Sequence, residues 1–464
     1  MTIAYDLSNG QDGYLKFGAK ARIRDKTNDV RSQTFGAYRE QSTLYPSLGA
    51  PLNLATIRDD FYEDNLLNKG YELTFIPSAQ GLRDFYEFYP QYFIFDRNES
   101  RKNSYNADYK FSENIYAAYA MLRHNIGKLM ILGGVRFERT DIINNQGFGV
   151  IVSGSRFIGI DTIVSARTKD FLLPQVQLRY AINPNLNIRG ALTYTYSRPN
   201  YEDVIPSREQ DREEVSIGNP ELEYPSSLNV DFLIERYFKT SLLSGGLFYK
   251  RIEDFVFSFK RFGREGDPNS GTPLVEITKP INGNRSFVYG AELQAQFKFD
   301  FLSGFFSDFG VFTNYTYTYS EAFINQRFPA NYADAVTIDL LNDDLGVFFA
   351  TDGEEKITLP GQAQHTANVA LFYDAKKLFT RLSVNYQDAF LYRLGADADL
   401  DEYYDEALRL DLTANYQITP NINIFTDWIN INNAPLRFYL GEPSRIKQQE
   451  FYSWWNRIGV RMKF

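Results

Sequence analysis

The stretch LRLDLTANYQITPNINIFTDWIN, from Leu408 to Asn430, predicts two consecutive β-strands joined by a tight turn. Apolar side chains occupy every second position from Leu408 to Tyr416, and polar residues, among them Arg409 and Asp411, fill the positions between them. Successive side chains of a strand point to opposite faces of its sheet, so this strand has one apolar face and one hydrophilic face. The ITPN segment between the two strands has the composition of a turn.

The same alternation recurs in NLNIRGALTYTYSR (185–198), VYGAELQAQFKF (288–299) and TRLSVNYQ (380–387). Strands of this kind run to ten residues or more, whereas the strands of a soluble sandwich average about 5 or 6 residues. A tilted strand that spans a bilayer needs about 9–11 residues. We therefore expect transmembrane strands, and the alternative is a large soluble β-protein whose aromatic side chains form its core.

The connections between the alternating segments are short and long in turn. The short ones are rich in turn-forming residues: NIGK (125–128), INPN (182–185), FLSG (301–304), DAKK (374–377) and ITPN (418–421). The long ones cover residues 38–110, 143–167, 198–225, 259–285, 320–362, 393–404 and 441–449. Short periplasmic turns and long extracellular loops are typical of outer-membrane barrels. The fold class we expect is all-β, an antiparallel transmembrane β-barrel.

Counting the alternating segments gives about 14–15 strands. A truncated first strand is expected at 1–7. The others are expected at 13–36, 111–124, 128–142, 168–181, 185–197, 226–238, 243–258, 286–300, 305–320, 363–374, 378–392, 405–416, 421–440 and 449–464. Bacterial single-chain barrels have even strand counts, so a short strand at the front suggests a piece of a larger barrel.

Composition excludes several function classes. The 464 residues carry a net charge of -9, which argues against nucleic acid as a partner, because phosphate binding requires a basic face. No apolar run approaches the roughly 18 residues of a membrane-spanning helix, and the mean hydropathy is -0.38. The chain has no Cys, only His124 and His365, and no nucleophile or phosphate-binding motif. We expect no enzyme activity, no catalytic residue, no cofactor and no metal site. We interpret the acidic loops near 333–356 and 397–406 as solvated, and the alternative is that they bind a hard cation such as calcium.

Four segments carry a resemblance to a known family. YSRPNYEDVIP (196–206) resembles the SRPxYxDL element of TonB-dependent outer-membrane receptors, and GNPELEY (218–224) resembles their GNPxLKPE segment. ILGGVRFERT (131–140) resembles an LxGGVRxExT strand, and the terminal WNRIGVRMKF (455–464) resembles the last strand of these receptors. The sequence departs from the family at 222–225, where Leu-Glu-Tyr-Pro stands in place of LKPE.

The resemblance implies an outer-membrane location in a Gram-negative bacterium, with outer-membrane lipid as one partner. Residues 1–464 would be the C-terminal β-barrel portion, 14–15 strands of a 22-strand barrel, with an N-terminal plug domain and the first strands encoded ahead of them. The further partners implied are that plug, the TonB energy-transducing system and an extracellular nutrient such as a siderophore or a glycan. The alternative is a passive channel, or a truncated structural barrel that does not transport.

Two sets of residues are candidates for the site. The resemblance places ligand contacts in extracellular loops, and the longest loop holds an aromatic group made of Phe85, Tyr86, Phe88, Tyr89 and Tyr92. The polar rows of the strands are expected to face the lumen, at Arg189, Glu292, Arg381, Arg409 and Asp411. For both sets a purely structural role remains open: a loop packed on its neighbours, and side chains that only solvate the lumen.

Overall fold

The computed structural model describes residues 2–7, 11–37, 57–66, 70–90, 93–153, 156–210, 214–265, 274–327, 336–338 and 353–463. They belong to two compact units. The sheet unit comprises Met1–Lys26, Lys110–Gly147 and Ile163–Phe464, and the second unit comprises Thr27–Tyr109 and Phe148–Thr162.

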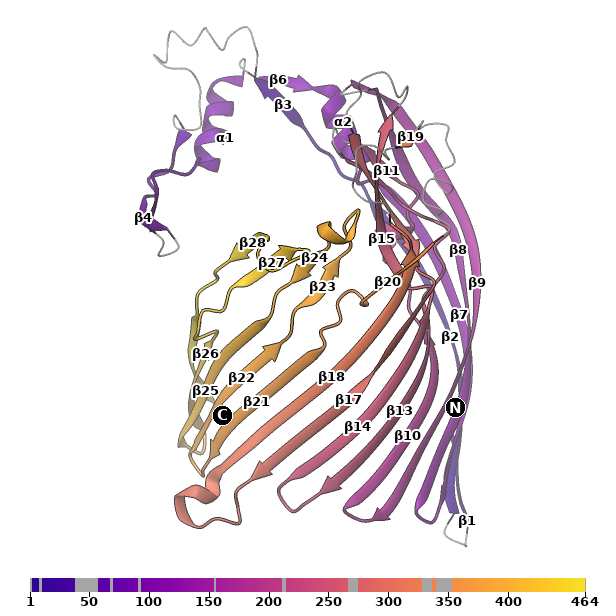
Figure 1. The fold of residues 1–464 in the computed structure, drawn as a ribbon, viewed down its shortest axis with the longest axis vertical. Coiled ribbons are helices and arrows are strands. Elements are labelled where there is room, and N and C mark those ends of the chain that lie inside the picture. Colours follow the sequence, from indigo (N-terminus) through magenta and orange to yellow (C-terminus); the bar gives the residue numbers. More distant parts are fainter. Residues whose placement is uncertain are drawn as a thin grey trace. The chain divides into compact units, whose positions relative to one another are not determined.

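The sheet unit is built on one large sheet of antiparallel strands (Figure 1). The strands that succeed one another across it are β1 (Thr2–Leu7), β2 (Gln11–Asn28), β7 (Tyr109–Ile126), β8 (Leu129–Ser153), β9 (Arg156–Asn183), β10 (Leu186–Tyr196), β13 (Ser226–Tyr237), β14 (Leu242–Glu253), β17 (Arg285–Lys298), β18 (Phe309–Asn325), β21 (His365–Asp374), β22 (Leu378–Gln387), β25 (Ala407–Thr419), β26 (Ile422–Ile429) and β29 (Trp455–Met462). The expected all-β class is confirmed. No pairing among the described residues joins β1 to β29, so a closed barrel is not formed within this sheet.

Register confirms the two-faced pattern of the strands. Arg189 of β10 lies opposite Leu233, which lies opposite Gly246, which in turn lies opposite Glu292 of β17. Paired residues in neighbouring strands point to the same side of a sheet. Followed across β18, β21, β22 and β25, the same rule puts all five polar candidates on one side, here called the polar face.

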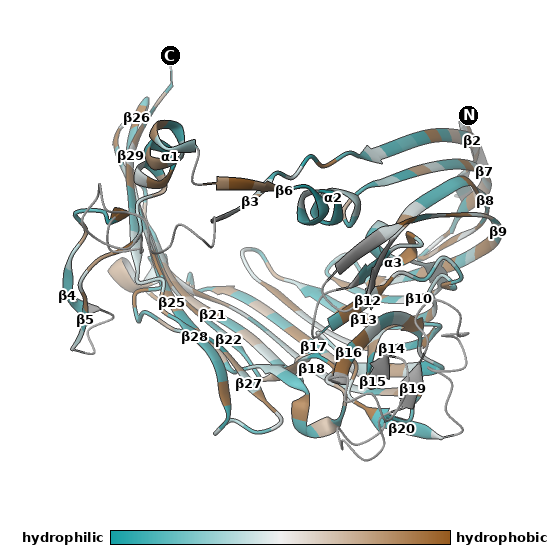
Figure 2. Cartoon of the chain, turned by 90° about the horizontal axis from the view of Figure 1, so that it is seen from above, coloured by the Kyte–Doolittle hydropathy of each residue, from teal (hydrophilic) through white to brown (hydrophobic). Residues whose placement is uncertain are grey.

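The opposite face, here called the apolar face, carries large hydrophobic side chains that are exposed. Leu247 is 61% exposed and Leu293 is 59% exposed, and similar residues alternate along the neighbouring strands (Figure 2). A soluble monomer rarely exposes a contiguous apolar patch larger than a few hundred Å². The apolar face is therefore suited to contact with lipid acyl chains.

Four of the five predicted turns separate the strands as expected, at the β7–β8, β9–β10, β21–β22 and β25–β26 connections. The fifth is longer than predicted. A 3₁₀-helix, η4 (Gly304–Asp308), begins at the last residue of the FLSG segment, so β18 begins at Phe309 and not at 305.

Several predicted boundaries are wrong. The expected strand 13–36 ends at Asn28, the strand 243–258 ends at Glu253 and the strand 378–392 ends at Gln387, and the last strand begins at Trp455 and not at 449. Residues 143–167 are not an irregular loop, because β8 continues to Ser153 and β9 begins at Arg156. The expected strand 421–440 ends at Ile429, because Asn430 and Asn433 adopt φ values of 57° and 48°, which turn the chain.

The other long connections of the sheet unit are folded. They contain a short helix, α3 (Tyr201–Val204), and additional strands. This helix, these strands and the segments that connect them are here called the loop layer. Its strands are β11 (Arg208–Gln210), β12 (Glu214–Ile217), β15 (Val256–Glu265), β16 (Leu274–Asn282), β19 (Val336–Ile338), β20 (Glu354–Ile357), β23 (Phe390–Arg393), β24 (Glu402–Tyr404), β27 (Leu436–Leu440) and β28 (Ile446–Glu450). A hydrophobic core holds several of them together, with Phe259, Ile277, Ile324 and Leu391 almost fully buried. Burial of such side chains stabilises the layer by about 1.5–3 kcal/mol each.

The second unit contains two helices and short strand pairs. Helix α1 (Ala79–Phe88) begins at Ser78, whose hydroxyl accepts a hydrogen bond from the Gly81 backbone, and helix α2 (Arg97–Tyr105) begins at Asp96, whose carboxylate caps Glu99. The strand pairs are β3 (Thr34–Ala37) with β6 (Phe93–Asp96), and β4 (Glu63–Leu66) with β5 (Tyr71–Leu73). None of the helices in the described ranges is long and apolar enough to cross a membrane.

Candidate functional site

The second unit holds the aromatic group predicted from the sequence. The Phe85 ring lies 5.1 Å from the Tyr89 ring and 5.9 Å from the Phe93 ring, and Tyr86 lies 5.2 Å from both Phe93 and Phe35, measured between ring centroids. Helix α1 supplies Phe85 and Tyr86, Tyr89 caps the end of that helix, and strands β3 and β6 supply Phe35 and Phe93. Such tilted contacts are the arrangement that aromatic quadrupoles favour.

The members of this group differ in what they offer to a ligand. Phe88 is 76% exposed, Tyr86 is 38% exposed, and Phe85 and Tyr89 are half-buried. Tyr92 lies outside the described residues. The half-buried rings hold the helix in place, and the exposed faces of Phe88 and Tyr86 are available for stacking on a planar or sugar-like ligand.

The candidates on the polar face are joined to their neighbours by hydrogen bonds. Arg189 Nε donates to Glu235 Oε2 at 2.7 Å. Asp411 accepts from the Asn385 side-chain amide at 3.1 Å and from the Asn430 backbone N–H at 2.9 Å. These partners hold the Arg189 and Asp411 side chains in place on the polar face.

The remaining candidates on this face behave similarly. Arg381 Nε donates to the Ser383 hydroxyl at 3.0 Å, and Arg409 Nη2 donates to the Tyr404 hydroxyl at 3.1 Å. Glu292 lines a cavity of about 510 Å³ over β13, β14, β17 and β18. The structure thus aligns the five residues on one face without gathering them into one site.

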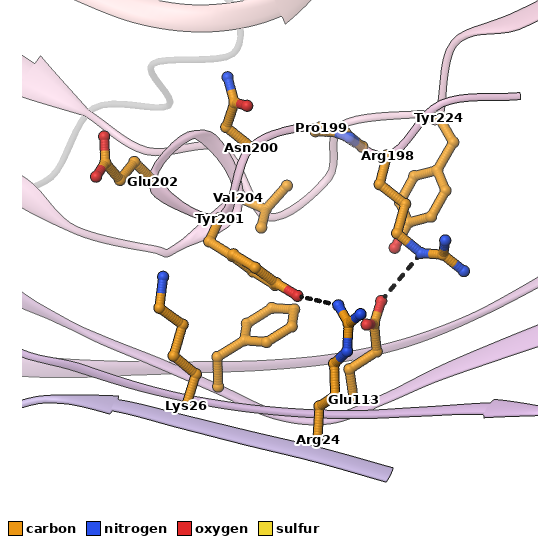
Figure 3. A pocket seen from close by; sticks show the side chains of 11 residues that line it. Arg24, Lys26, Glu113, Arg198, Pro199, Asn200, Tyr201, Glu202, Val204 and Tyr224 are labelled. Atoms are coloured by element: carbon orange, nitrogen blue, oxygen red, sulfur yellow. Dashed lines mark hydrogen bonds and ion pairs between the residues drawn. The ribbon is translucent and has the colours of Figure 1, made fainter. Parts of the chain in front are cut away.

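A second site lies in the sheet unit, where three of the family-like segments meet. A cavity of about 450 Å³ is lined by residues of β2, β7 and the segment that begins with Arg198. Figure 3 shows these lining side chains. Arg24 donates from Nη1 to the Tyr201 hydroxyl at 3.0 Å, and the Lys26 ammonium lies 4.8 Å from the centre of the same ring. Cationic donors of this kind can bind carboxylate, phosphate or phenolate oxygens.

Arg198 is the centre of this site. Its guanidinium pairs with Glu113 at 3.3 Å and with Glu138 at 2.6 Å, and it also donates to the Thr140 hydroxyl at 3.1 Å. The Tyr196 hydroxyl donates to Glu138 as well. Glu113 is only 1% exposed and Glu138 only 6%, and Arg136 also pairs with Glu138 at 2.5 Å, so two cations balance two carboxylates that water barely reaches. Glu113 Oε2 has no hydrogen-bond partner among the described residues.

The GNPELEY segment contributes Tyr224 to the lining of the same cavity. The buried Tyr224 ring stacks 5.5 Å from Phe171, and burial raises the pKa of the Tyr224 hydroxyl to about 12. Glu223 is partly buried, yet hydrogen bonding to Lys169 and the charge of Arg167 hold its pKa below the ordinary value. These pairs bind the segment to strand β9.

Gly218 opens that segment where no side chain fits. A Cβ at this position would lie 1.8 Å from the Ile205 carbonyl oxygen, which belongs to the backbone and cannot rotate away. The Gly218 N–H donates to the Ser207 carbonyl at 2.9 Å, so this hydrogen bond holds the backbone of Gly218 close to the 205–207 segment.

Comparison with known proteins gives the family. A family model described as TonB dependent receptor-like, beta-barrel, matches residues 2–434. The chain belongs to this family. TonB-dependent receptors are transport receptors of the Gram-negative outer membrane, so the family predicted from the four segments is confirmed. No curated protein sequence matches the chain.

Solved receptor structures share the fold. The FrpB iron transporter from Neisseria meningitidis gives a TM-score of 0.51 at 12% identity, covering 100% of this chain and 54% of that one. The ferric-catecholate import receptor Fiu from K12 E. coli gives 0.55 at 12%, covering 100% and 53%. The copper transporter OprC gives 0.57 at 10%, covering 99% and 56%. The receptor chain therefore spans about half the length of these structures, and the likeness establishes the all-β outer-membrane barrel fold.

Sequence reasoning missed a buried ion triad in the loop layer of this receptor chain. Arg327 donates to Glu355 from Nη2 at 2.6 Å and from Nε at 3.0 Å, to Asp401 from Nη2 at 3.1 Å, and to the Gly395 carbonyl from Nη1 at 3.2 Å. The side chains of Arg327 and Asp401 are 2% and 5% exposed. Three loops that are separate in the sequence are thereby tied together.

The sequence marks some of the residues in these ion pairs and not others. Arg198 and Glu138 stand inside the quoted family-like segments, so the resemblance marks them, although the ion pairs between them are visible only in the structure. Glu113 and Arg327 have no such signal, because an acidic or basic residue at a polar strand position looks solvated in the sequence. In the described part of the chain no three acidic or histidine side chains are grouped closely enough to hold a metal ion.

Proposed function

We propose that this chain is the barrel portion of an outer-membrane receptor that imports a bulky nutrient with energy delivered by the TonB system. In this proposal residues 1–464 belong to a 22-strand barrel, and a plug domain with a TonB-contacting segment is encoded ahead of them. The protein acts as a receptor and transporter and not as an enzyme.

The observation that carries the proposal is the match of residues 2–434 to the family model. The two faces of the sheet support it. A polar face lined with Arg, Asp and Glu suits a water-filled lumen occupied by a plug, and an apolar face of exposed Leu, Phe and Val suits lipid.

Two surfaces support a bulky ligand. The exposed rings of Phe88 and Tyr86 suit stacking on an aromatic chelator or on a sugar ring. The cations around Tyr201 suit oxygen anions. Iron–siderophores and glycans fit these surfaces best, and vitamins and peptides remain within the proposal. One structural neighbour, named as a ferric-catecholate import receptor, agrees with the first of these classes.

The experiment is uptake measured in a Gram-negative host, with and without the gene for this receptor, and with and without TonB. The probes are an iron-loaded catecholate siderophore, an iron-loaded hydroxamate siderophore and a panel of linear oligosaccharides. We expect accumulation of one probe class to require both genes. Accumulation that requires the receptor but continues without TonB would overturn the proposal in favour of a passive channel.

A further inference from the structure

The connection between β17 and β18 carries a patch of exposed phenylalanines, here called the Phe turn, at the lower end of these strands in Figure 1. Phe301 is 77% exposed, Phe305 is 60% exposed and Phe306 is 61% exposed, with Leu302 beside them. Each large apolar side chain left in water forgoes the favourable free energy of burial. Four in one turn indicate a partner.

The turn holds its shape through its own backbone. The Phe299 N–H donates to the Phe309 carbonyl at 2.8 Å, the Leu302 N–H donates to the Phe299 carbonyl at 2.9 Å, and the Ser307 hydroxyl donates to the Gly304 carbonyl at 2.6 Å. Gly304 supplies the positive φ of 64° that the reversal requires. The rings are therefore presented by a defined turn.

The rings of the Phe turn are continuous with the apolar face. Phe305 lies 5.2 Å from Phe309 and 5.0 Å from Tyr373, and Phe301 lies 6.0 Å from Phe299. Phe309 and Tyr373 are register partners and alternate with the polar-face positions of their strands, so they belong to the apolar face. The turn thus extends that face past the ends of the strands, and away from the lumen.

The chemistry of the patch selects lipid as its partner. Phenylalanine has no polar atom, whereas the tyrosines and tryptophans of an interfacial belt keep one group in water. The two flanking turns carry exposed lysines, Lys239 on one side and Lys376 and Lys377 on the other. Lysine pairs with phosphate headgroups while its stem lies along apolar surface.

We propose that the Phe turn is a membrane anchor, with its four apolar side chains inserted among the acyl chains of the periplasmic leaflet. The flanking lysines then lie at the level of the lipid phosphates. This inference rests on the proposed function, because it requires the apolar face to be surrounded by a bilayer. The anchor fixes the depth of the β17–β18 hairpin in the membrane.

The absence of cysteine from the chain makes a clean test available. Single cysteines are introduced by Phe305→Cys, Phe306→Cys, Leu293→Cys and Gln296→Cys, and each is labelled with a nitroxide in the complete receptor in outer-membrane vesicles. Collision with molecular oxygen, which partitions into acyl chains, is compared with collision with a water-soluble nickel chelate. Leu293 samples the middle of the apolar face, and Gln296 samples the polar face.

We expect oxygen-dominated collisions at 305, 306 and 293, and lower oxygen preference at 296. Nickel-dominated collisions at 305 and 306, with oxygen still dominant at 293, would overturn the anchor and leave the membrane barrel standing. Protection of 305 and 306 from both reagents would also overturn it, because the turn would then be covered by protein. Nickel-dominated collisions at 293 would instead refute the proposed membrane barrel.

Discussion

The Arg327 triad gives the sharpest prediction about the loop layer. Replacing Arg327 by Met keeps the length and the apolar stem of the side chain but removes the cation. Asp401, 5% exposed, then loses its buried counterion, whereas the half-buried Glu355 can still reach water. The expected effect is local opening of the loops that meet at this residue, with the sheet beneath them intact.

The magnitude follows from burial. Removing one partner of a buried ion pair costs about 3–5 kcal/mol, because it leaves an uncompensated charge away from water. One tenfold change in an equilibrium constant corresponds to about 1.4 kcal/mol, so the opening equilibrium should rise by roughly 10² to 10³·⁵. Backbone hydrogen exchange of a locally opening segment rises by the same factor.

The assay is hydrogen exchange read by mass spectrometry on the receptor in nanodiscs, in peptides covering 353–362 and 390–405. Arg285→Met is the matched control, because Arg285 pairs with the neighbouring Glu354 at 3.3 Å with 41% and 42% of the two side chains exposed. Such a pair contributes about 0–1 kcal/mol, or at most about a fivefold change in exchange.

A second variant separates charge from packing. Asp401→Asn added to Arg327→Met removes the stranded charge, while the side-chain oxygen can still accept from the Gly395 N–H, now at 2.9 Å. We expect the double variant to recover most of the protection. The reasoning is refuted if Arg327→Met exchanges within threefold of Arg285→Met, or if the double variant opens further than the single one.

Three further predictions concern other parts of the chain. Gly218→Ala should lower stability in a detergent thermal melt by about 1–3 kcal/mol, because its Cβ meets a backbone oxygen at 1.8 Å, while Gly190→Ala, whose nearest atom lies at 3.9 Å, should change it by less than about 0.5 kcal/mol. The folded-state pKa of Glu223 is lowered, so its ion pairs should stabilise the receptor above about pH 4.5 and lose this effect as the pH falls through the lowered pKa. The difference in stability between wild type and Glu223→Gln should therefore shrink on acidification, and a difference that grows contradicts this. Phe88→Ala should weaken binding of the imported nutrient by about 5- to 30-fold in a titration, with the melting temperature unchanged, and unchanged binding would place the ligand elsewhere.

Much of the sheet could be predicted from local sequence. The alternation from Leu408 to Tyr416 specifies two faces, and the register places Arg409 and Asp411 on the polar one, as expected. A side-chain period of two allows no other arrangement once one face must be apolar. The segment NINNAP, which begins at Asn430, has the composition of a turn. The LRFYL segment that follows it has the pattern of a strand, so the sequence pattern predicted one continuous strand across both.

The loop layer and the ion pairs could not be predicted in the same way. Ile277 and Leu391 form part of one core although they are far apart in the sequence, and Arg327 lies 74 positions from Asp401. Whether such residues are solvated or buried depends on which loops contact one another, and the alternation of residue types along the sequence does not indicate those contacts. The role of the aromatic group remains a prediction, with Phe85 and Tyr89 packed within it and Phe88 outward.

The Arg198 site has a consequence for the order of assembly. Glu113 stands on β7 and Glu138 on β8, two strands that pair early because they are adjacent in the chain, whereas Arg198 follows β10. Within the β7–β8 hairpin, Arg136 already pairs with Glu138, whereas the buried Glu113 gains its ion pair only when Arg198 docks, so the hairpin reaches its full stability at that later step. We therefore expect a chain stopped before residue 198 to bury the Glu113 carboxylate without its counterion, and so to leave the β7–β8 hairpin less stable than in the full sheet.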